Sequence, residues 1–302
     1  MDRHIEIKIY DSCCDLPECR WKGMIVDFEK EFAVKTYAVF AYIQDEMVGF
    51  MRVLRNPDNV CEWYTCDVHV SVGYRRQGIA IFMYEKAIEV VSEYYRATNI
   101  MASISAMNTA SVQLHEKIGF IPSGIKSRFA HNIFEEDETM YYYWLAKLYP
   151  AKNVPVHIEK LFPMWKKYMI EIGEADSDIK LLDALKSRIN LSEVHDNIFF
   201  EIIWSGNNVI GFAFYSIDGG IKDAIPSGYG YIMEFFILPE WRNKYIGSRC
   251  VKNICEKLKN RGCPQVYLTS VPASEEFWRK NKFVKSDLID LDNQLFIWLK
   301  GV

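Results

Sequence analysis

The sequence predicts an α/β protein made of two tandem domains. The chain has 302 residues, which suits two domains of roughly 100 to 200 residues each. Hydrophobic residues make up 50% and charged residues 25%, the composition of a folded globular protein. One order of strands and helices also occurs twice along the chain, and internal similarity of this kind indicates a duplicated unit.

The first copy of this unit begins with an apolar strand and a turn within 67–80. A helix is predicted over 81–95, where apolar residues recur at three- and four-residue spacing. A second strand over 100–106 and a short helix that ends near residue 120 follow. The order is therefore strand, turn, helix, strand and short helix.

The second copy repeats this order on a similar scale. Its strand and turn lie within 234–247, and its helix covers 248–261. The next strand is predicted over 265–271, and the last short helix ends near residue 283. Agreement in order and in length indicates duplication rather than coincidence.

A short connection separates the two copies. Residues 149–155 contain two prolines and show no periodicity, which is typical of a linker. We therefore expect a first domain over 1–149 and a second over 153–302.

Similar elements are expected upstream of each copy. Helices are predicted around 16–31 and within 161–189, and hairpin-like strands over 38–54 and 197–217. The expected hairpin turns are at Asp45-Glu46 and Gly206-Asn207.

Composition narrows the class of function. No apolar run approaches the roughly 20 residues of a membrane helix, and the N-terminus lacks the layout of a signal peptide. We therefore expect a cytoplasmic protein without a membrane partner, whose eight cysteines are reduced thiols. They form no C-x-x-C pair, so no metal site is expected. With 36 basic and 40 acidic residues, the chain lacks the basic excess of nucleic-acid-binding proteins. A small-molecule partner is favoured.

The turn after the first strand carries the strongest chemical signal. It opens a helix directly after a strand, where free backbone N–H groups and the positive end of the helix dipole favour phosphate oxygens. Gly78 allows the backbone to approach an anion closely and to adopt unusual dihedral angles. The residues of this loop are Arg75, Arg76, Gln77, Gly78, Ile79 and Ala80.

This loop resembles that of the GNAT N-acetyltransferases, whose acetyl-CoA loop reads R/Q-x-x-G-x-G/A. Here the pattern is Arg75-x-x-Gly78-x-Ala80. A second family feature, an Asn followed by a short helix and a Gly-Phe pair, is similar to the segment 108–120. The second half resembles the same family over 153–302, so the chain looks like a tandem member.

The resemblance implies a fold and a cofactor position. Each domain would hold a mixed twisted sheet flanked by helices, with two central parallel strands splayed apart around the pantetheine of acetyl-CoA. The pyrophosphate would lie on the loop 75–80, and the main chain of Val68, His69 and Val70 would bind the pantetheine. Asn108 and Ser111 would also contact the cofactor. Direct attack of an amine on the thioester would follow.

An amine must lose its proton before it can attack, because an ammonium has no lone pair. Period-2 alternation puts Asp67 and His69 on one face of the strand and Val68 and Val70 on the other. Asp67 is the candidate base, acting through a water molecule. The alternative is that Asp67 is only a solvated or hydrogen-bonded strand residue. Glu234 holds the same place in the second unit.

His115 is the candidate acid. Many relatives have a tyrosine at this position, which protonates the departing CoA thiolate, and some amino-acid-type acetyltransferases have a histidine as here. A thiolate also departs readily without an acid. The alternative for His115 is simple packing on the helix beside Glu116.

The second unit departs further from the family pattern. Tyr245 replaces the first loop glycine, Trp278 stands at the acid position and Lys282 replaces the glycine of the Gly-Phe pair. Arg242 and Gly247 remain. We expect this unit to be degenerate.

The leading hypothesis is therefore transfer of an acetyl group from acetyl-CoA to a primary amine of a small molecule by the first domain. One alternative is an acyl-CoA-binding or sensor protein without turnover, and another is a tandem acyltransferase whose C-terminal domain is active. The acidic run 135–138 could attract a cationic acceptor, although a solvated loop is the simpler interpretation. A monomer or a homodimer is expected.

Overall fold

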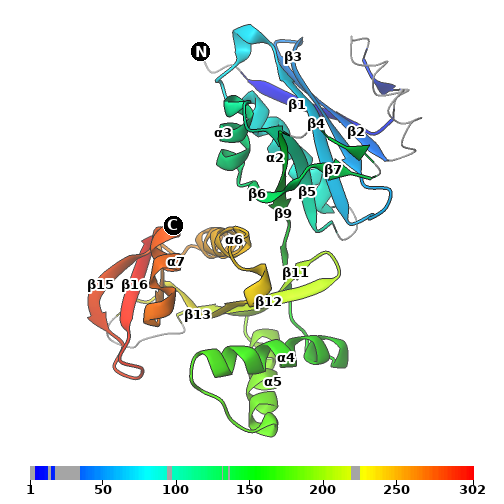
Figure 1. Cartoon of the computed structure of the whole chain (residues 1–302). Coiled ribbons are helices and arrows are strands. Elements are labelled where there is room, and N and C mark those ends of the chain that lie inside the picture. The colour runs from blue at the N-terminus through cyan, green and yellow to red at the C-terminus, as the bar shows by residue number, and fades with distance from the viewer. Residues whose placement is uncertain are drawn as a thin grey trace. The chain divides into compact units, whose positions relative to one another are not determined.

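The computed structural model divides the chain into two compact units, Met1–Leu145 and Ala146–Val302 (Figure 1). The residues that it describes are 4–12, 15–17, 35–93, 97–130, 132–134, 137–218 and 225–302. The helix predicted around 16–31 lies almost entirely outside these residues.

The first unit is built on a mixed seven-stranded sheet with the order β1-β2-β3-β4-β5-β9-β6. The strands are β1 (Ile5–Tyr10), β2 (Thr36–Ile43), β3 (Glu46–Arg55), β4 (Glu62–Val70), β5 (Asn99–Ser105), β6 (Ile121–Lys126) and β9 (Glu138–Trp144). A separate small hairpin consists of β7 (Arg128–Phe129) and β8 (Asn132–Ile133). The helices of this unit are the 3-10 turn η2 (Val72–Tyr74), α2 (Ile79–Glu93) and α3 (Thr109–Ile118).

Strands β4 and β5 are the parallel pair in the centre of this sheet. They are paired only at Glu62↔Asn99, Trp63↔Ile100 and Tyr64↔Met101, and no pairing continues beyond Tyr64. The two strands therefore separate toward their C-terminal ends, as the resemblance implied.

The hairpin between β2 and β3 turns one residue earlier than expected. Gln44 and Asp45 both have positive φ angles, of 51° and 64°. Positive angles at both central residues define the hairpin turn whose twist matches that of the flanking strands. Asp45 tolerates this conformation because aspartate visits it more readily than most residues.

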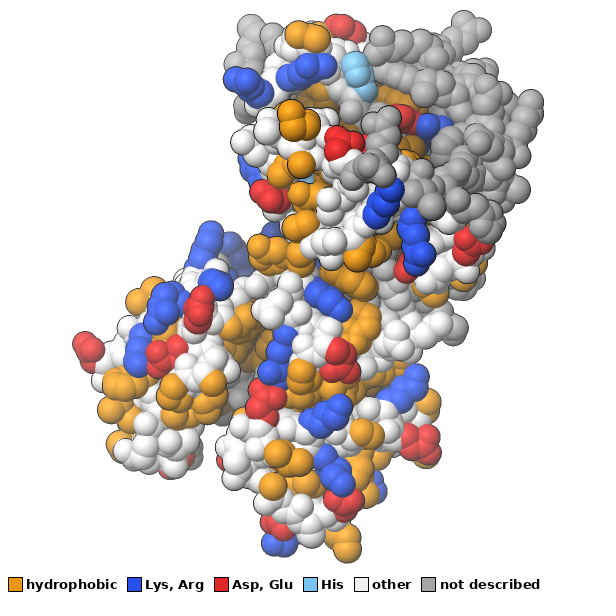
Figure 2. Space-filling view, in the orientation of Figure 1, with side chains coloured by type: hydrophobic (Ala, Val, Ile, Leu, Met, Phe, Trp, Pro, Cys, Tyr) orange, Lys and Arg blue, Asp and Glu red, His pale blue; other side chains and the backbone are white. Residues whose placement is uncertain are grey.

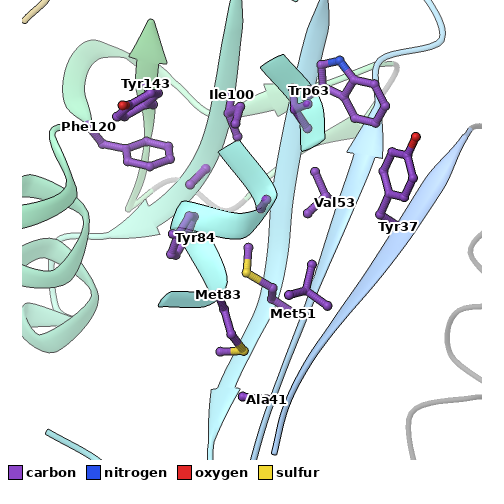
Figure 3. Packing of buried hydrophobic residues seen from close by; sticks show 14 of the residues in the cluster. Tyr37, Ala41, Met51, Val53, Trp63, Met83, Tyr84, Ile100, Phe120 and Tyr143 are labelled. Atoms are coloured by element: carbon purple, nitrogen blue, oxygen red, sulfur yellow. The ribbon is translucent and has the colours of Figure 1, made fainter. Parts of the chain in front are cut away.

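Helix α2 packs its apolar stripe against the sheet. Ile79, Met83, Tyr84, Ala87 and Val91 are buried at three- and four-residue spacing, the pattern of an amphipathic helix. Figure 3 shows Met83 and Tyr84 facing strand residues such as Met51 and Ile100. Burial of each large side chain contributes about 2 kcal/mol. This packing fixes the N-terminus of α2 at the end of β4.

The second unit repeats the sheet with the order β10-β11-β12-β13-β14-β16-β15. Its strands are β10 (Lys147–Pro150), β11 (Ile198–Ser205), β12 (Asn208–Ile217), β13 (Gly230–Ile237), β14 (Gln265–Thr269), β15 (Val284–Ile289) and β16 (Phe296–Gly301). Its helices are α4 (Pro155–Glu171), α5 (Asp178–Val194), the 3-10 turns η3 (Pro239–Trp241) and η4 (Pro272–Ser274), α6 (Ile246–Asn260) and α7 (Glu275–Lys280). The parallel pair is β13 and β14, which join only at Gly230↔Val266 and Tyr231↔Tyr267.

The duplicated α/β architecture is therefore confirmed, and the connection between the units is shorter than expected. Lys147–Pro150, which the sequence assigned to the end of the first domain and to the linker, forms strand β10 and pairs with β11 of the second sheet. The predicted helical region 161–189 is two helices, separated by a turn in which Gly173 has a φ of 82°. Among the described helices, none combines the length and the apolar character that crossing a membrane requires.

Candidate active site

The loop between β4 and α2 has the geometry of an anion-binding turn. Arg76 and Gly78 both have positive φ angles, of 63° and 81°, and α2 begins immediately afterwards at Ile79. The Arg75 side chain ties the loop down, because its Nε donates to the carbonyl oxygen of Val70 over 3.0 Å. The first backbone N–H groups of α2 have no carbonyl one turn earlier to bond, so they are available to a phosphate.

Gly78 is required for its backbone angle rather than for space. A Cβ atom built at this position would meet only the ring of Phe82, at an ordinary distance of 3.5 Å. An L-residue at φ +81° would be strained by about 1 kcal/mol. Gln77 also supports the loop through a weak 3.4 Å hydrogen bond from its Nε2 to the carbonyl of Gly73.

Asp67 lies on a bulge in β4. The pairing between β3 and β4 shifts between Phe50↔His69 and Arg52↔Cys66, and Asp67 adopts a positive φ of 54° there. Its Oδ2 accepts hydrogen bonds from the Arg52 guanidinium, and the Arg52 side chain is only 6% exposed. The carboxylate that the sequence identified as a candidate base is therefore engaged in a salt bridge.

The neighbouring strand residues take the expected sides. Val68 and Val70 pack against the core under α2, opposite the face on which Asp67 meets Arg52. His69 pairs in register with Phe50 and is not among the residues around the cavity described next.

A cavity of about 610 Å³ opens where β4 and β5 separate. It is bounded by residues of β3, β4, β5 and β9, of helices α2 and α3, and of the segment around the β7–β8 hairpin. The residues around it are Arg52, Tyr64, Thr65, Cys66, Asp67, Val68, Tyr84, Ala102, Ser103, Asn108, Ser111, His115, Phe129, Phe134 and Glu138. The structure thus brings Asp67, Val68, Asn108, Ser111 and His115, which are far apart in sequence, to one cavity.

Asn108 and Ser111 form the start of α3. The Oδ1 atom of Asn108 accepts a hydrogen bond from the backbone N–H of Ser111 over 3.1 Å, which is a helix N-cap. Such a cap stabilises a helix by about 1 kcal/mol. The cap fixes the Asn108 side chain on the wall of the cavity, and the Ser111 side chain lines the same wall.

His115 is a buried neutral imidazole. Its side chain packs edge-on against Tyr84 and Phe120, and burial lowers the pKa of His115 to about 4. Nδ1 lies 2.8 Å from the carbonyl oxygen of Ser111, which can only accept, so Nδ1 carries the proton. Nε2 is then an acceptor and receives the hydroxyl proton of Tyr84 over 2.5 Å. At neutral pH His115 accordingly accepts at Nε2 and has no proton to donate there.

The sequence analysis did not identify Tyr84 and Arg52 as residues around the cavity, and it named Glu138 only within the acidic run 135–138. Tyr84 hydrogen-bonds His115 and lies 3.2 Å from the hydroxyl of Thr65, and its own pKa is raised by burial. Arg52 interrupts the apolar run 47–54 within β3 and is buried, and this signal could have indicated a buried partner. Glu138 accepts a hydrogen bond from the Ser103 hydroxyl. No local signal marks Tyr84, because it sits on the apolar stripe of α2.

The loop of the second unit keeps the backbone shape of the first. Arg242 Nε donates to the carbonyl of Ile237 over 2.8 Å, which matches the bond between Arg75 and Val70. Asn243 and Tyr245 have positive φ angles of 60° and 54°. The Tyr245 side chain is 57% exposed, so it does not fill the turn.

Aromatic rings cluster where β13 meets α6 and α7 in the second unit. Phe235, at the place of Val68, stacks on Phe277 with ring centroids 5.9 Å apart. Trp278, at the place of His115, is buried and meets both rings edge-on. The Phe277 ring also lies against the first turn of α6, where a Cβ on Gly247 would approach it to 3.1 Å.

Glu234 occupies the place of Asp67 in this unit. It pairs with Arg188 of α5 at 2.8 Å, and its other carboxylate oxygen is buried without a hydrogen-bond partner. Burial raises the pKa of Glu234 to about 7, against the opposing effect of Arg188. Within the described parts of both units, no three His, Cys, Asp or Glu side chains are grouped closely enough to hold a metal ion.

Comparison with known families gives one match, which occurs twice. The model of the acetyltransferase (GNAT) family matches residues 8–120 and again 158–283. The two matches together cover more than half of the chain and correspond to the two units. No curated protein matches the sequence.

Solved structures with a similar fold match about half of the chain. The PaiA N-acetyltransferase from Thermoplasma acidophilum in complex with coenzyme A is 19% identical, with 52% of this chain and 99% of that chain covered and a TM-score of 0.40. An acetyltransferase from Thermus thermophilus is 14% identical, with 53% and 99% covered and a TM-score of 0.43. An aminoglycoside N-acetyltransferase in complex with CoA is 15% identical, with 48% and 91% covered and a TM-score of 0.40.

Proposed function

Because this chain belongs to the GNAT family of acetyltransferases, we propose that it transfers the acetyl group of acetyl-CoA to a primary amine of a small molecule, with the chemistry in the first unit. The observation that carries the proposal is the cavity between β4 and β5, which is lined by Val68 of β4 and by Tyr84 of α2 among others. A phosphate-binding turn and an open cleft between splayed strands occur together in this unit.

The positions of the loop and the cavity suggest which residues would bind the cofactor. Backbone N–H groups of the loop 75–80 would hold the pyrophosphate, with Arg75 fixing the loop from behind and Gly78 providing the turn. The pantetheine would run along Val68, His69 and Val70 in the gap that the separating strands leave open. Asn108 and Ser111 would contact it from α3, since both side chains line the same cavity.

Asp67 is the proposed proton acceptor for the attacking amine, acting through a water molecule. The bulge and the positive φ aim its carboxylate at the cavity, and Arg52 holds it in one position. General bases of this kind typically accelerate reactions by about 100- to 10,000-fold. The same salt bridge also suits a protein that binds acyl-CoA without turnover, because a carboxylate held by a guanidinium can be purely structural.

Departure of the thiolate would not use a protonated histidine. With a pKa of about 4, His115 is neutral at pH 7, and its Nε2 receives a proton rather than offering one. A thiol has a solution pKa of about 8.5, so a thiolate is a tolerable leaving group near neutral pH. We therefore give His115 the role of a neutral group that orients the Tyr84 hydroxyl beside the cavity.

The second unit would support the first without binding acetyl-CoA. The rings of Phe235, Phe277 and Trp278 fill the space that corresponds to the first-unit cleft. This filling, more than Tyr245 in the loop, supports a single cofactor per chain.

The test is to titrate acetyl-CoA into the full chain by calorimetry and to follow release of CoA with a panel of primary amines. Binding of acetyl-CoA with amine-dependent release of CoA would support the proposal. Binding without release across the amine panel would favour the sensor interpretation, and absence of binding would refute both.

A further inference from the structure

The cavity of the first unit has two differently composed sides. Thr65, Tyr84 and His115 line it on the side of α2 and α3. Tyr64 and Phe129 belong to a separate cluster on the opposite face of the sheet, and they line the other side. An acetyl-CoA whose pyrophosphate is bound at the start of α2 would enter from the helical side. The opposite side is then left for the acceptor, a step that rests on the proposed function.

On the side of the cavity opposite α2 and α3, the charged side chains do not neutralise one another completely. Arg52 and Asp67 neutralise each other through their salt bridge. Glu138 at the start of β9 accepts a hydrogen bond from the neutral hydroxyl of Ser103. Among the residues that the structure describes, no lysine or arginine pairs with Glu138. Within the described part of the chain, one negative charge in the wall of the cavity therefore has no cationic partner within salt-bridge distance.

Aromatic rings stand beside this carboxylate. Tyr64 stacks on Phe129 with centroids 4.8 Å apart and on Phe134 with centroids 5.6 Å apart. All three rings line the cavity together with Glu138. Ring faces attract cations, and an aromatic wall also suits a flat apolar body.

We infer that this side of the cavity binds the acceptor as an ammonium ion on a flat apolar body, with the ammonium on Glu138 and the body against Tyr64 and Phe134. Glu138 is then a specificity-determining residue, distinct from Asp67, which the salt bridge with Arg52 holds in place. A carboxylate in a half-enclosed site favours a cation over a neutral hydroxyl because the hydrogen bond is charge-assisted.

Binding of two matched probes to the full chain tests this inference. Calorimetry with CoA present compares 2-phenylethylammonium with 2-phenylethanol, which share one body and differ in charge. The ammonium should bind about 10- to 100-fold more tightly than the alcohol, as expected for one charge-assisted hydrogen bond. Glu138→Gln should reduce this preference to less than about 3-fold, because the amide keeps the acceptor for Ser103 but lacks the charge.

Asp137→Asn is the matched control. Asp137 is exposed, accepts a hydrogen bond from Ser105 and is not among the residues that line the cavity, so the preference should persist in this variant. Unchanged CoA affinity would show that both variants are folded. The inference is wrong if Glu138→Gln keeps the preference, if wild type has none, or if neither probe binds. If wild type does not bind CoA but still prefers the ammonium probe, the proposed function is wrong and the inference about Glu138 stands.

Discussion

The Tyr84 hydroxyl lies 2.5 Å from Nε2 of His115, and the two side chains come from different helices that border the cavity. The imidazole donates a hydrogen bond from Nδ1–H to the carbonyl oxygen of Ser111 and accepts one at Nε2 from the Tyr84 hydroxyl. Thr65 extends the chain, since its hydroxyl lies 3.2 Å from Tyr84 and 3.2 Å from the carbonyl of Met101. These hydrogen bonds stabilise the neutral form of the imidazole relative to the protonated form.

This arrangement predicts how acid affects stability. The pKa of His115 is about 4 in the folded protein and about 6.5 in the unfolded chain, so the unfolded chain binds more protons between these values. Stability from the neutral imidazole is complete above pH 6.5 and is lost as the pH falls toward 4, by about 3 kcal/mol in total. Hydrogen exchange of α3 amides from pH 7 to 4.5 measures this loss.

The comparison for this prediction is His115→Gln, which has no titrating group. Its opening free energy in α3 should be lower at pH 7 but should fall less steeply with acid than that of wild type. A parallel fall in both proteins would assign the acid sensitivity to other groups. His157, which lies in the second unit, also has a lowered pKa, so the readout must be restricted to α3.

Asp67→Asn tests the proposed base. Asparagine tolerates positive φ nearly as well as aspartate, so the bulge should persist. We expect kcat for acetyl transfer to fall about 100-fold or more, because the carboxylate that is proposed to accept the ammonium proton is removed. The affinity for acetyl-CoA should change little. Steady-state release of CoA and calorimetry measure the two quantities.

Asp45→Asn is the matched control for this variant. Asp45 also has a positive φ, of 64°, but it lies in the β2–β3 turn and is not among the residues that line the cavity. It should leave kcat unchanged. An Asp67→Asn enzyme with wild-type kcat would move the proton acceptor elsewhere and reduce the Arg52 salt bridge to a structural contact.

The duplicated fold could be predicted from the sequence because strand and helix periodicities depend on local order. The positive φ of Gly78 could also be predicted, because a glycine at the start of a helix that follows a strand indicates such a turn. Tyr245 shows the limit of this reasoning. Its side chain was one reason to expect a degenerate unit, yet the backbone adopts the left-handed conformation with φ 54°. Surrounding structure can impose about 1 kcal/mol of strain on a non-glycine residue.

The chemical contacts of the site could not be read from the sequence. Arg52 meets Asp67 across two strands, and the spacing of residues does not predict the bulge at which they meet. Tyr84 meets His115 between two helices, where no spacing rule applies. Surface charges give no further guidance, because basic and acidic side chains are interspersed on the visible face of the second unit (Figure 2).

Two substitutions of Gly78 should separate the effect of backbone strain on acetyl-CoA binding from the effect of charge. A Cβ fits beside Phe82, so Gly78→Ala should fold and weaken acetyl-CoA binding by less than about 10-fold, the equivalent of roughly 1 to 1.4 kcal/mol of strain. Gly78→Glu adds a negative charge where the pyrophosphate would lie and should abolish binding. Equal affinities for the two variants, measured by calorimetry at one ionic strength, would place the phosphates elsewhere.

Exchanging the side chains at the corresponding positions Val68 and Phe235 should have opposite effects on acetyl-CoA binding in the two units. Wild type should bind one acetyl-CoA per chain by native mass spectrometry, because Phe235 fills the second cleft by stacking on Phe277 while Val68 lines an open one. Val68→Phe should place a ring in the first cleft and reduce the count to zero, with circular dichroism confirming the fold. Tyr245→Gly should leave the count at one, since the loop already has its shape.

Phe235→Val should destabilise the second unit by roughly 2 kcal/mol, because it leaves a cavity, and the space that it opens should admit a weakly bound second cofactor. Two cofactors bound to wild type would contradict this account, because the rings of the second unit would then have to move aside at little cost, and the assignment of catalysis to the first unit would lose its main structural support.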